Sequence, residues 1–376
     1  MSLSLWLSAC SLERAESSSD ISDPVEIEGL SVSSVYVPEY ASGFNVTYYD
    51  GGYRYLKTTE GNDYLVIPEG LEAPKDLPEG TTVISSTPDH IYMAASAIMS
   101  LIAAMDAMSD ISFSALDIDG WHIPDAIDAM ESGDLKYAGK YSNPDYELLL
   151  DGDCDLAVES TMILHTPEVA EKLETVGIPV LIDYSSYEDD PLGRSEWIVF
   201  YGALLDRNDE AQEFFASQKA ILEEIGEAEP TGQSIAFFFV NAAGQIVVRR
   251  GDDYIPRMIK MGGGSYIYED LQTTNTDSHS GSVTLTAEQF YADARDADIL
   301  IYNGTIDSAL SSVDELIDKN EMFAQFDAVK TGRVYTTNKD LYQSTDRMAE
   351  MIRDIHTLLT SEDPQSTTYS FLVHVR

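Results

Sequence analysis

The chain has 376 residues, and its 22 Lys and Arg against 66 Asp and Glu give a formal net charge of −44. Hydrophobic residues make up 44% of the chain and 22 residues are Tyr, which is enough apolar and aromatic surface for a folded protein of two or three domains. Because there is no excess of cations, we expect no nucleic-acid binding and no adhesion of the protein surface to anionic lipid.

The N-terminal part, from residue 25 to residue 79, is irregular and rich in Tyr, Gly and Pro. Two segments of strand-forming residues, 45–49 and 53–56, flank the Asp-Gly-Gly sequence at 50–52. This pattern is typical of a β-hairpin turn. We therefore predict a small β-rich N-terminal extension.

Short apolar strands then alternate with helices, which indicates an α/β fold with a parallel sheet covered by helices. The apolar stretch at 91–105 is too short to span a bilayer and is read as part of a buried helix, with Thr87 as its N-cap. In chain order we expect strands at 82–85, 112–116, 137–139, 156–159 and 179–183, and helices at 88–108, 123–131, 144–150 and 166–176.

Two further helices, 193–205 and 209–225, precede a Gly- and Pro-containing boundary at 226–232. A second α/β half follows, with expected strands at 235–240, 245–249, 299–302 and 333–336, and helices at 254–261, 287–294, 306–320 and 344–359. The predicted domains are a shortened leader and flexible tether at 1–24, an N-terminal lobe at 25–206, a bridging helix at 207–228 and a C-terminal lobe at 229–376.

Candidate ligand-binding residues follow from the rule that ligands of open α/β sheets lie beyond the carboxyl ends of the strands. Cations are scarce in this chain, so an Arg near that edge is informative, since its guanidinium can grip carboxylate or catecholate oxygens. The candidates are Trp121, His122, Tyr184, Arg194, Trp197, Arg249, Arg250 and Tyr254.

These candidates have simpler alternatives. Arg249 and Arg250 are adjacent, so their side chains point to opposite faces and at most one faces a cleft; both could be solvated charges at a strand end. Trp121 beside His122 could stack on a flat ligand and ligate iron, or could cap the core. The six His residues are widely scattered in the sequence, which disfavours a site for bare zinc or manganese.

Several motifs together resemble a known family. They are 173–180 (LETVGIPV), 201–205 (YGALL), 261–264 (MGGG), 297–301 (ADILI) and 328–335 (AVKTGRVY), and 191–197 (PLGRSEW) resembles a signature of its iron-complex branch. In their order and spacing they are similar to the substrate-binding lipoproteins of bacterial ABC importers for iron–siderophore complexes, haem and cobalamin. The resemblance runs over about residues 82–362. It implies two Rossmann-like lobes joined by a single long helix, with the ligand in a cleft between them.

The resemblance also implies partners and a location. Glu147 and Glu288 occupy the positions where the family docks on the ABC permease dimer, although both are also first-turn acids favoured by the helix dipole. Cys10 closes residues 7–10 (LSAC), which resemble a lipobox, so we expect a lipidated, extracytoplasmic monomer that touches the membrane only through its lipid anchor.

The expected ligand is an iron chelate, with a ferric siderophore favoured over haem or cobalamin, and we expect no catalytic residue, resident cofactor or resident metal. Two other classes of function stay open. One is an enzyme on the same scaffold, but the sequence contains no G-x-S-x-G, P-loop or H-E-x-x-H motif. The other is a surface adhesin that uses the β-rich extension.

Overall fold

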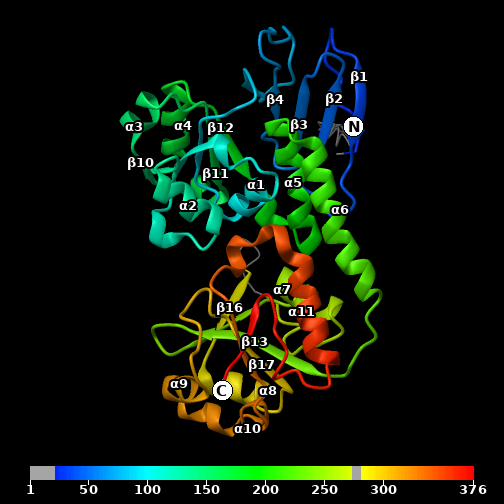
Figure 1. Ribbon diagram of the computed structural model, residues 1–376, viewed down its shortest axis with the longest axis vertical. Coiled ribbons are helices and arrows are strands. Elements are labelled where there is room, and N and C mark those ends of the chain that lie inside the picture. Colours follow the sequence, from blue (N-terminus) through cyan, green and yellow to red (C-terminus); the bar gives the residue numbers. More distant parts are fainter. Residues whose placement is uncertain (1–21, 273–280) are drawn as a thin grey trace, which may run out of the picture.

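The computed structural model describes residues 22–272 and 281–376, so Cys10 and its predicted lipidation lie outside the described residues. Figure 1 shows two α/β lobes, one above the other, with a separate N-terminal sheet beside the upper lobe. Within the described ranges no helix is both long enough and apolar enough to cross a bilayer.

The N-terminal sheet is larger than the predicted extension. Its strands run in the order β1-β2-β3-β4-β5, and Gly51 and Gly52 form the hairpin turn between β2 and β3 with φ of 88° each, as the Asp-Gly-Gly sequence predicts. The predicted strand at 82–85 exists, but it pairs with β4 in this sheet and not in the lobe. The strands are β1 (Val32–Tyr36), β2 (Phe44–Tyr49), β3 (Arg54–Thr58), β4 (Tyr64–Val66) and β5 (Thr82–Ile84).

The N-terminal lobe is built on a parallel sheet with the order β12-β11-β6-β7-β8. Its strands are β6 (Ile91–Met93), β7 (Ile111–Ser114), β8 (Lys136–Tyr137), β11 (Leu156–Ser160) and β12 (Val180–Asp183), with a small β9 (Gly139–Lys140) and β10 (Asn143–Pro144) pair beside it. Its helices are α1 (Met99–Ala104), α2 (Pro124–Ser132), α3 (Tyr146–Asp151) and α4 (Pro167–Thr175).

The predicted helix at 88–108 is wrong over its first half. Residues 91–93 form the central strand β6, which pairs with β7 on one side and β11 on the other, and only α1 and a short 3-10 turn remain helical. Thr87 caps no helix, and its hydroxyl instead accepts a hydrogen bond from Arg54. A strand buried on both faces is as continuously apolar as a buried helix, so hydrophobicity does not separate the two.

Two helices lead out of the N-terminal lobe. α5 (Pro191–Leu205) is almost wholly buried, and α6 (Asn208–Ile225) packs against both α5 and the last helix of the chain. Asp206, with φ of 59°, makes the sharp corner between them. α6 is the single long connection predicted from the sequence, and it passes from the upper lobe to the lower lobe in Figure 1.

The C-terminal lobe has a mixed sheet with the order β16-β14-β13-β17-β18-β19, and β15 also pairs with β13. Of the predicted helix at 306–320, only residues 313–319 (α9) are helical, so the prediction is wrong before residue 313. The strands are β13 (Ser234–Val240), β14 (Ile246–Arg249), β15 (Ser265–Tyr266), β16 (Ser282–Leu285), β17 (Ile299–Tyr302), β18 (Val334–Thr337) and β19 (Leu372–His374). The helices are α7 (Tyr254–Met261), α8 (Ala287–Ala294), α9 (Val313–Lys319), α10 (Asp327–Thr331) and α11 (Met348–Thr360).

Candidate ligand cleft

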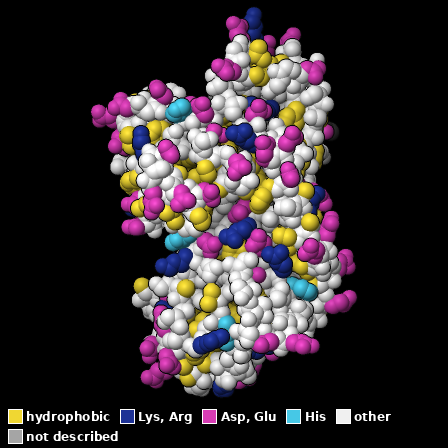
Figure 2. Space-filling view, viewed as in Figure 1, with side chains coloured by type: hydrophobic (Ala, Val, Ile, Leu, Met, Phe, Trp, Pro, Cys, Tyr) yellow, Lys and Arg dark blue, Asp and Glu magenta, His cyan; other side chains and the backbone are white. Residues whose placement is uncertain are grey.

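A cavity of about 200 Å³ lies between the two lobes, and we call it the arginine cavity. Three of the predicted residues line it: Arg194 from the N-terminal lobe, and Arg249 and Tyr254 from the C-terminal lobe. Figure 2 shows Asp and Glu side chains over both lobes, whereas several Lys and Arg side chains lie at the waist between them. The other lining residues are Ala97, Ser185, Ser186, Leu341, Tyr342, Thr345 and Met348.

Arg194 is held rigidly at the start of α5. The Asp190 side chain caps this helix, and the Arg194 guanidinium donates from Nε to the Glu188 carbonyl at 2.9 Å and from Nη2 to the Ser186 carbonyl at 2.7 Å. Its guanidinium carbon lies 3.8 Å from the centre of the Tyr254 ring, a stacked cation–π contact across the gap between the lobes. A positive charge at a helix N-terminus opposes the helix dipole, and these contacts compensate for that.

Arg249, the last residue of β14, is a second cation close to Tyr254. It donates from Nε to Asp253 Oδ1 at 3.1 Å and from Nη1 to Ser282 Oγ at 3.1 Å. Its guanidinium carbon lies 5.7 Å from the ring centre of Tyr254 and 5.6 Å from that of Tyr342. Burial lowers the pKa of Arg249, but Tyr342 and Asp253 outweigh it and the net pKa is raised, so the group stays charged.

The two tyrosines give the cavity an aromatic wall. Burial raises the pKa of Tyr254 above its usual value, so its phenol keeps its proton. The Tyr342 hydroxyl accepts a hydrogen bond of 2.7 Å from Asn303 Nδ2, which fixes that ring. Two guanidinium groups beside aromatic faces can bind a ligand that is anionic at its oxygens and flat or apolar elsewhere. Tyr342 was not predicted from the sequence.

Both predicted tryptophans lie in the core of the N-terminal lobe and not in the cavity. Trp121 is 2% exposed and donates from Nε1 to Ser114 Oγ at 3.1 Å, and Trp197 is fully buried and donates to Glu188 Oε1 at 3.0 Å. With its indole N–H satisfied, each ring gains more from burial in the core than from exposure in a cleft. The core-capping alternative for Trp121 is therefore the one observed.

Two more predicted residues do not line the arginine cavity. Tyr184 is buried, and its hydroxyl donates to Asn62 Oδ1 of the N-terminal part at 2.6 Å. Arg250 pairs with Asp252 through Nε at 2.8 Å and Nη2 at 3.1 Å. Only one of the two adjacent arginines lines the cavity, as the alternation of side chains along a strand predicts.

His122 lies in a second groove between the lobes, of about 390 Å³. Its backbone N–H donates to Gln343 Oε1 at 2.9 Å, and Gln343 Nε2 donates to the Gly120 carbonyl at 2.8 Å. Close by, Ser195 Oγ donates to the Thr345 carbonyl at 2.6 Å. These bonds join the lobes directly, so the gap between them is narrow in this conformation.

The two predicted docking acids are exposed first-turn residues in different lobes. Glu147 is in the first turn of α3, and Glu288 is in the first turn of α8. A capping box begins α8, because Thr286 Oγ1 accepts from the Gln289 N–H and Gln289 Oε1 accepts from the Thr286 N–H. Docking itself stays a prediction.

Comparisons with known proteins agree with this architecture. A family model described as periplasmic binding protein matches residues 117–341, which is more than half of the chain. An uncharacterized lipoprotein of Methanocaldococcus jannaschii is 24% identical over 360 residues, which cover 86% of this chain and 82% of that protein.

Solved structures share the fold at low identity. A periplasmic haem-binding protein of Vibrio cholerae matches with a TM-score of 0.58 and 16% identity, over 72% of this chain and 98% of that chain. An ABC-type Fe3+-hydroxamate transport system protein of Saccharomonospora viridis matches with a TM-score of 0.54 and 17% identity, over 73% of this chain and 94% of that one. At these identities the likeness extends to the two-lobed fold alone.

Proposed function

The chain belongs to the periplasmic binding protein family, and from this premise we propose that it is an extracytoplasmic receptor that captures an iron complex, most readily a ferric siderophore, and delivers it to an ABC permease. The observation that carries the proposal is the arginine cavity, which lies between the lobes and is flanked by Arg194 and Arg249. The role is binding and release, with no catalytic step.

The charge of the chain supports an anionic ligand. In a protein of net charge −44, an anion needs local cations, and the two arginines provide them where the lobes meet. A guanidinium presents a fork of N–H donors to carboxylate or catecholate oxygens. The structurally similar proteins of Vibrio cholerae and Saccharomonospora viridis are titled as haem-binding and as part of Fe3+-hydroxamate transport.

A siderophore is favoured over haem by the groups that line the cavity. Among the described residues, no His lines the arginine cavity. Burial holds the Tyr254 phenol protonated, and the Tyr342 hydroxyl already accepts a hydrogen bond from Asn303, so neither Tyr supplies a ready axial ligand for haem iron. The cavity is also smaller than the roughly 300–1,000 Å³ of typical ligand pockets. We therefore propose that the lobes separate slightly to admit the ligand.

The proposed location is the outer face of the cell membrane, with Cys10 as the site of lipid attachment. Its support is the lipobox-like segment at 7–10 and the relative that is named a lipoprotein. Glu147 and Glu288, exposed on separate lobes, are the proposed contacts with the permease. Incorporation of labelled palmitate that is lost in Cys10→Ala tests the anchor.

The ligand test uses the soluble chain with ferric hydroxamate, ferric catecholate, haem and cobinamide, followed by Tyr and Trp fluorescence and by thermal shift. A rise in melting temperature with one ferric siderophore is expected. Arg249→Ala should weaken that binding, whereas its neighbour Arg250→Ala, which pairs with Asp252 outside the cavity, should not. If only haem or only cobinamide binds, that compound and not a siderophore is the ligand. If none of the four compounds gives a response, the proposal is refuted.

A further inference from the structure

Three side chains with metal-binding atoms meet at the edge of the N-terminal lobe opposite to the arginine cavity. Asp89 and His90 directly precede β6, and Asp155 directly precedes β11. One ligand atom from each of the three lies within 4.8 Å of the other two. Since β6 and β11 are parallel, this is the amino-terminal edge of the sheet, whereas Ser185 and Ser186 of the cavity follow the carboxyl end of β12.

Two backbone N–H groups hold the Asp155 carboxylate next to Asp89 and His90. The Asp155 carboxylate accepts the N–H of His90 at Oδ1, at 3.2 Å, and the N–H of Asp89 at Oδ2, at 3.0 Å. His90 Nδ1 lies 2.8 Å from Asp89 Oδ1. Each carboxylate oxygen has a second lone pair, so these bonds leave acceptor capacity for a cation. Asp89 and His90 are exposed, which lets both side chains adjust to an ion.

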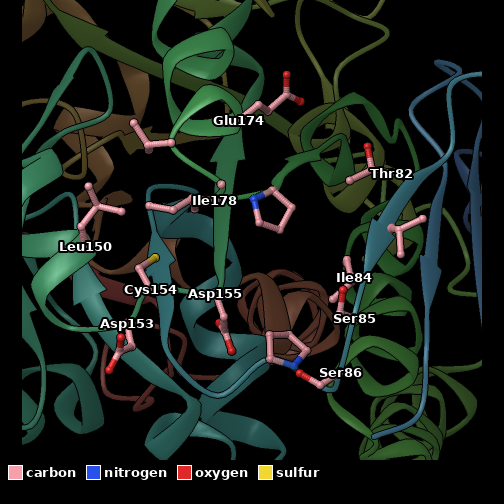
Figure 3. Close-up of a pocket in the computed structure, with 15 residues that line it drawn as sticks. Thr82, Ile84, Ser85, Ser86, Leu150, Asp153, Cys154, Asp155, Glu174 and Ile178 are labelled. Atoms are coloured by element: carbon pink, nitrogen blue, oxygen red, sulfur yellow. The ribbon is translucent and has the colours of Figure 1, made fainter. Parts of the chain in front are cut away.

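The group borders a cavity of about 660 Å³ between the N-terminal sheet and the lobe. Figure 3 shows Asp153 and Asp155 on the β11 side of this cavity and Ser85 and Ser86 on the opposite side. Asp155 therefore belongs both to the group and to the cavity wall. A hydrated cation can reach it through the open space.

The local charge is negative. Within residues 22–272 and 281–376, no Lys or Arg forms a salt bridge with Asp89, Asp153 or Asp155. The carboxylates of Asp89 and Asp155 lie close enough together to repel each other. Asp110 adds a fourth acid close by, with Arg207 beside it. A bound cation would relieve this repulsion.

We propose that Asp89, His90 and Asp155 bind one divalent transition-metal cation, such as Zn²⁺ or Mn²⁺, with water completing its coordination. An imidazole with two carboxylates suits such borderline ions better than Ca²⁺ or Mg²⁺, which prefer oxygen alone. The bound ion links the segment that enters β6 to the segment that enters β11, two neighbouring strands of the N-terminal lobe. This site is separate from the arginine cavity and does not depend on the proposed transport role.

Cys154 is the neighbour that could be mistaken for a ligand. It also lines the cavity, but its thiol donates to the Leu156 carbonyl at 3.5 Å, and burial raises its pKa to about 12. Its sulfur is also not among the ligand atoms that lie within 4.8 Å of one another in this group. Cys154→Ser should leave metal binding unchanged.

The test uses the full chain after treatment with EDTA, titrated with Zn²⁺ and Mn²⁺ by calorimetry and with Co²⁺ by visible absorption. One Zn²⁺ or Mn²⁺ per chain and a Co²⁺ d–d band are expected, with a rise in melting temperature. His90→Gln should weaken binding by about tenfold or more and remove the band, and Asp89→Asn should weaken binding as well. The matched control is His165→Gln, another exposed His of the same lobe, which should change nothing.

Circular dichroism confirms that each variant is folded before titration. Absence of saturable Zn²⁺, Mn²⁺ and Co²⁺ binding would overturn the proposal. So would binding that His90→Gln and Asp89→Asn leave intact, or weak binding of many ions per chain that Ca²⁺ matches, because that is the behaviour of a generally acidic surface.

Discussion

Arg194 and Tyr254 come from different lobes, and the guanidinium carbon of Arg194 lies 3.8 Å from the centre of the Tyr254 ring. The contact joins the first turn of α5 to the first residue of α7 across the arginine cavity. The same guanidinium is tied to the Glu188 and Ser186 carbonyls, so its plane is fixed before a ligand arrives. A preorganised cation of this kind loses little entropy on binding.

Arg194→Lys should weaken binding of an anionic ferric siderophore by about tenfold, because Lys keeps the charge but lacks the planar fork that both stacks and donates in parallel. Fluorescence titration of the variant and the parent measures the change. The matched control is Arg257→Lys on α7, which lies outside the cavity lining, is half exposed and pairs loosely with Asp190 at 3.6 Å. An affinity of Arg194→Lys equal to that of the control would mean that Arg194 does not contact the ligand.

The Glu196 carboxylate holds the N-terminal part of the chain to α5. Glu196 is fully buried and accepts hydrogen bonds from the Tyr36 hydroxyl at 2.7 Å and from the backbone N–H groups of Glu39, Tyr40 and Ala41 at 2.7–2.8 Å. Glu196→Gln replaces one acceptor oxygen by an amide that faces donors. We expect it to lower the free energy of unfolding by about 3 kcal/mol, measured by urea denaturation.

The control for this substitution is Glu213→Gln on α6, where the carboxylate is exposed. That variant should unfold within about 0.5 kcal/mol of the parent. Limited proteolysis adds a local measurement, since Glu196→Gln should expose residues 36–43 to cleavage. If both variants unfold at the same urea concentration, the four hydrogen bonds do not hold this segment.

Most strands and helices could be predicted from the sequence because their signals are local. Alternation along a strand predicted that at most one of Arg249 and Arg250 faces a cleft, and of the two Arg249 lines the cavity. Gly and Pro marked the ends of most helices. The clearest failure was β6, where three buried apolar residues in the middle of a sheet carry no periodicity. A strand that is buried on both faces is defined by its neighbours, and those neighbours lie far away in the sequence.

The candidate site was harder to predict, because it depends on contacts between distant segments. Trp121 and Trp197 were candidates because they lie beyond the carboxyl ends of strands, where ligands of such sheets bind. Both rings instead fill the core of the N-terminal lobe. Tyr342 lines the cavity from a loop of the C-terminal lobe that has no motif of its own. The hydrogen bonds from residues 36–41 to Glu196 join segments that are about 160 positions apart in the sequence, so no local pattern could indicate them.

The corner between α5 and α6 depends on close approach at Gly202. A Cβ at this position would lie 2.5 Å from the Ala211 Cβ and 3.0 Å from the Arg207 carbonyl oxygen. Gly202→Ala should therefore lower the free energy of unfolding by about 1–3 kcal/mol, because the two helices must move apart. Thermal unfolding combined with urea titration measures it.

A double-mutant cycle identifies the cause of that loss. In the Ala211→Gly background, the Cβ–Cβ clash is absent and Gly202→Ala should lower stability by less than it does in the parent. An equal loss in both backgrounds would assign the effect to the Arg207 carbonyl instead.

Glu159, on β11, is fully buried, and neither carboxylate oxygen has a hydrogen-bond partner among the described residues. Burial raises its pKa from 4.5 to about 8. The native state therefore holds a proton that the unfolded state releases near pH 4.5, so stability falls as the pH rises from about 4.5 to about 8. Glu159→Gln removes this titration, and at pH 9 it should exceed the parent in stability by on the order of 3 kcal/mol.

The pH range over which stability changes distinguishes Glu159 from two other buried acids, Asp183 and Asp346. Burial raises the pKa of Asp183 and of Asp346 to about 6, so their contributions change little above about pH 7. Urea unfolding of the parent and of Glu159→Gln at pH 5, 7, 8 and 9 should give curves that diverge with rising pH. Glu171→Gln, an exposed substitution on α4, should run parallel to the parent. Parallel curves for Glu159→Gln as well would show that this carboxyl group titrates normally in the folded protein.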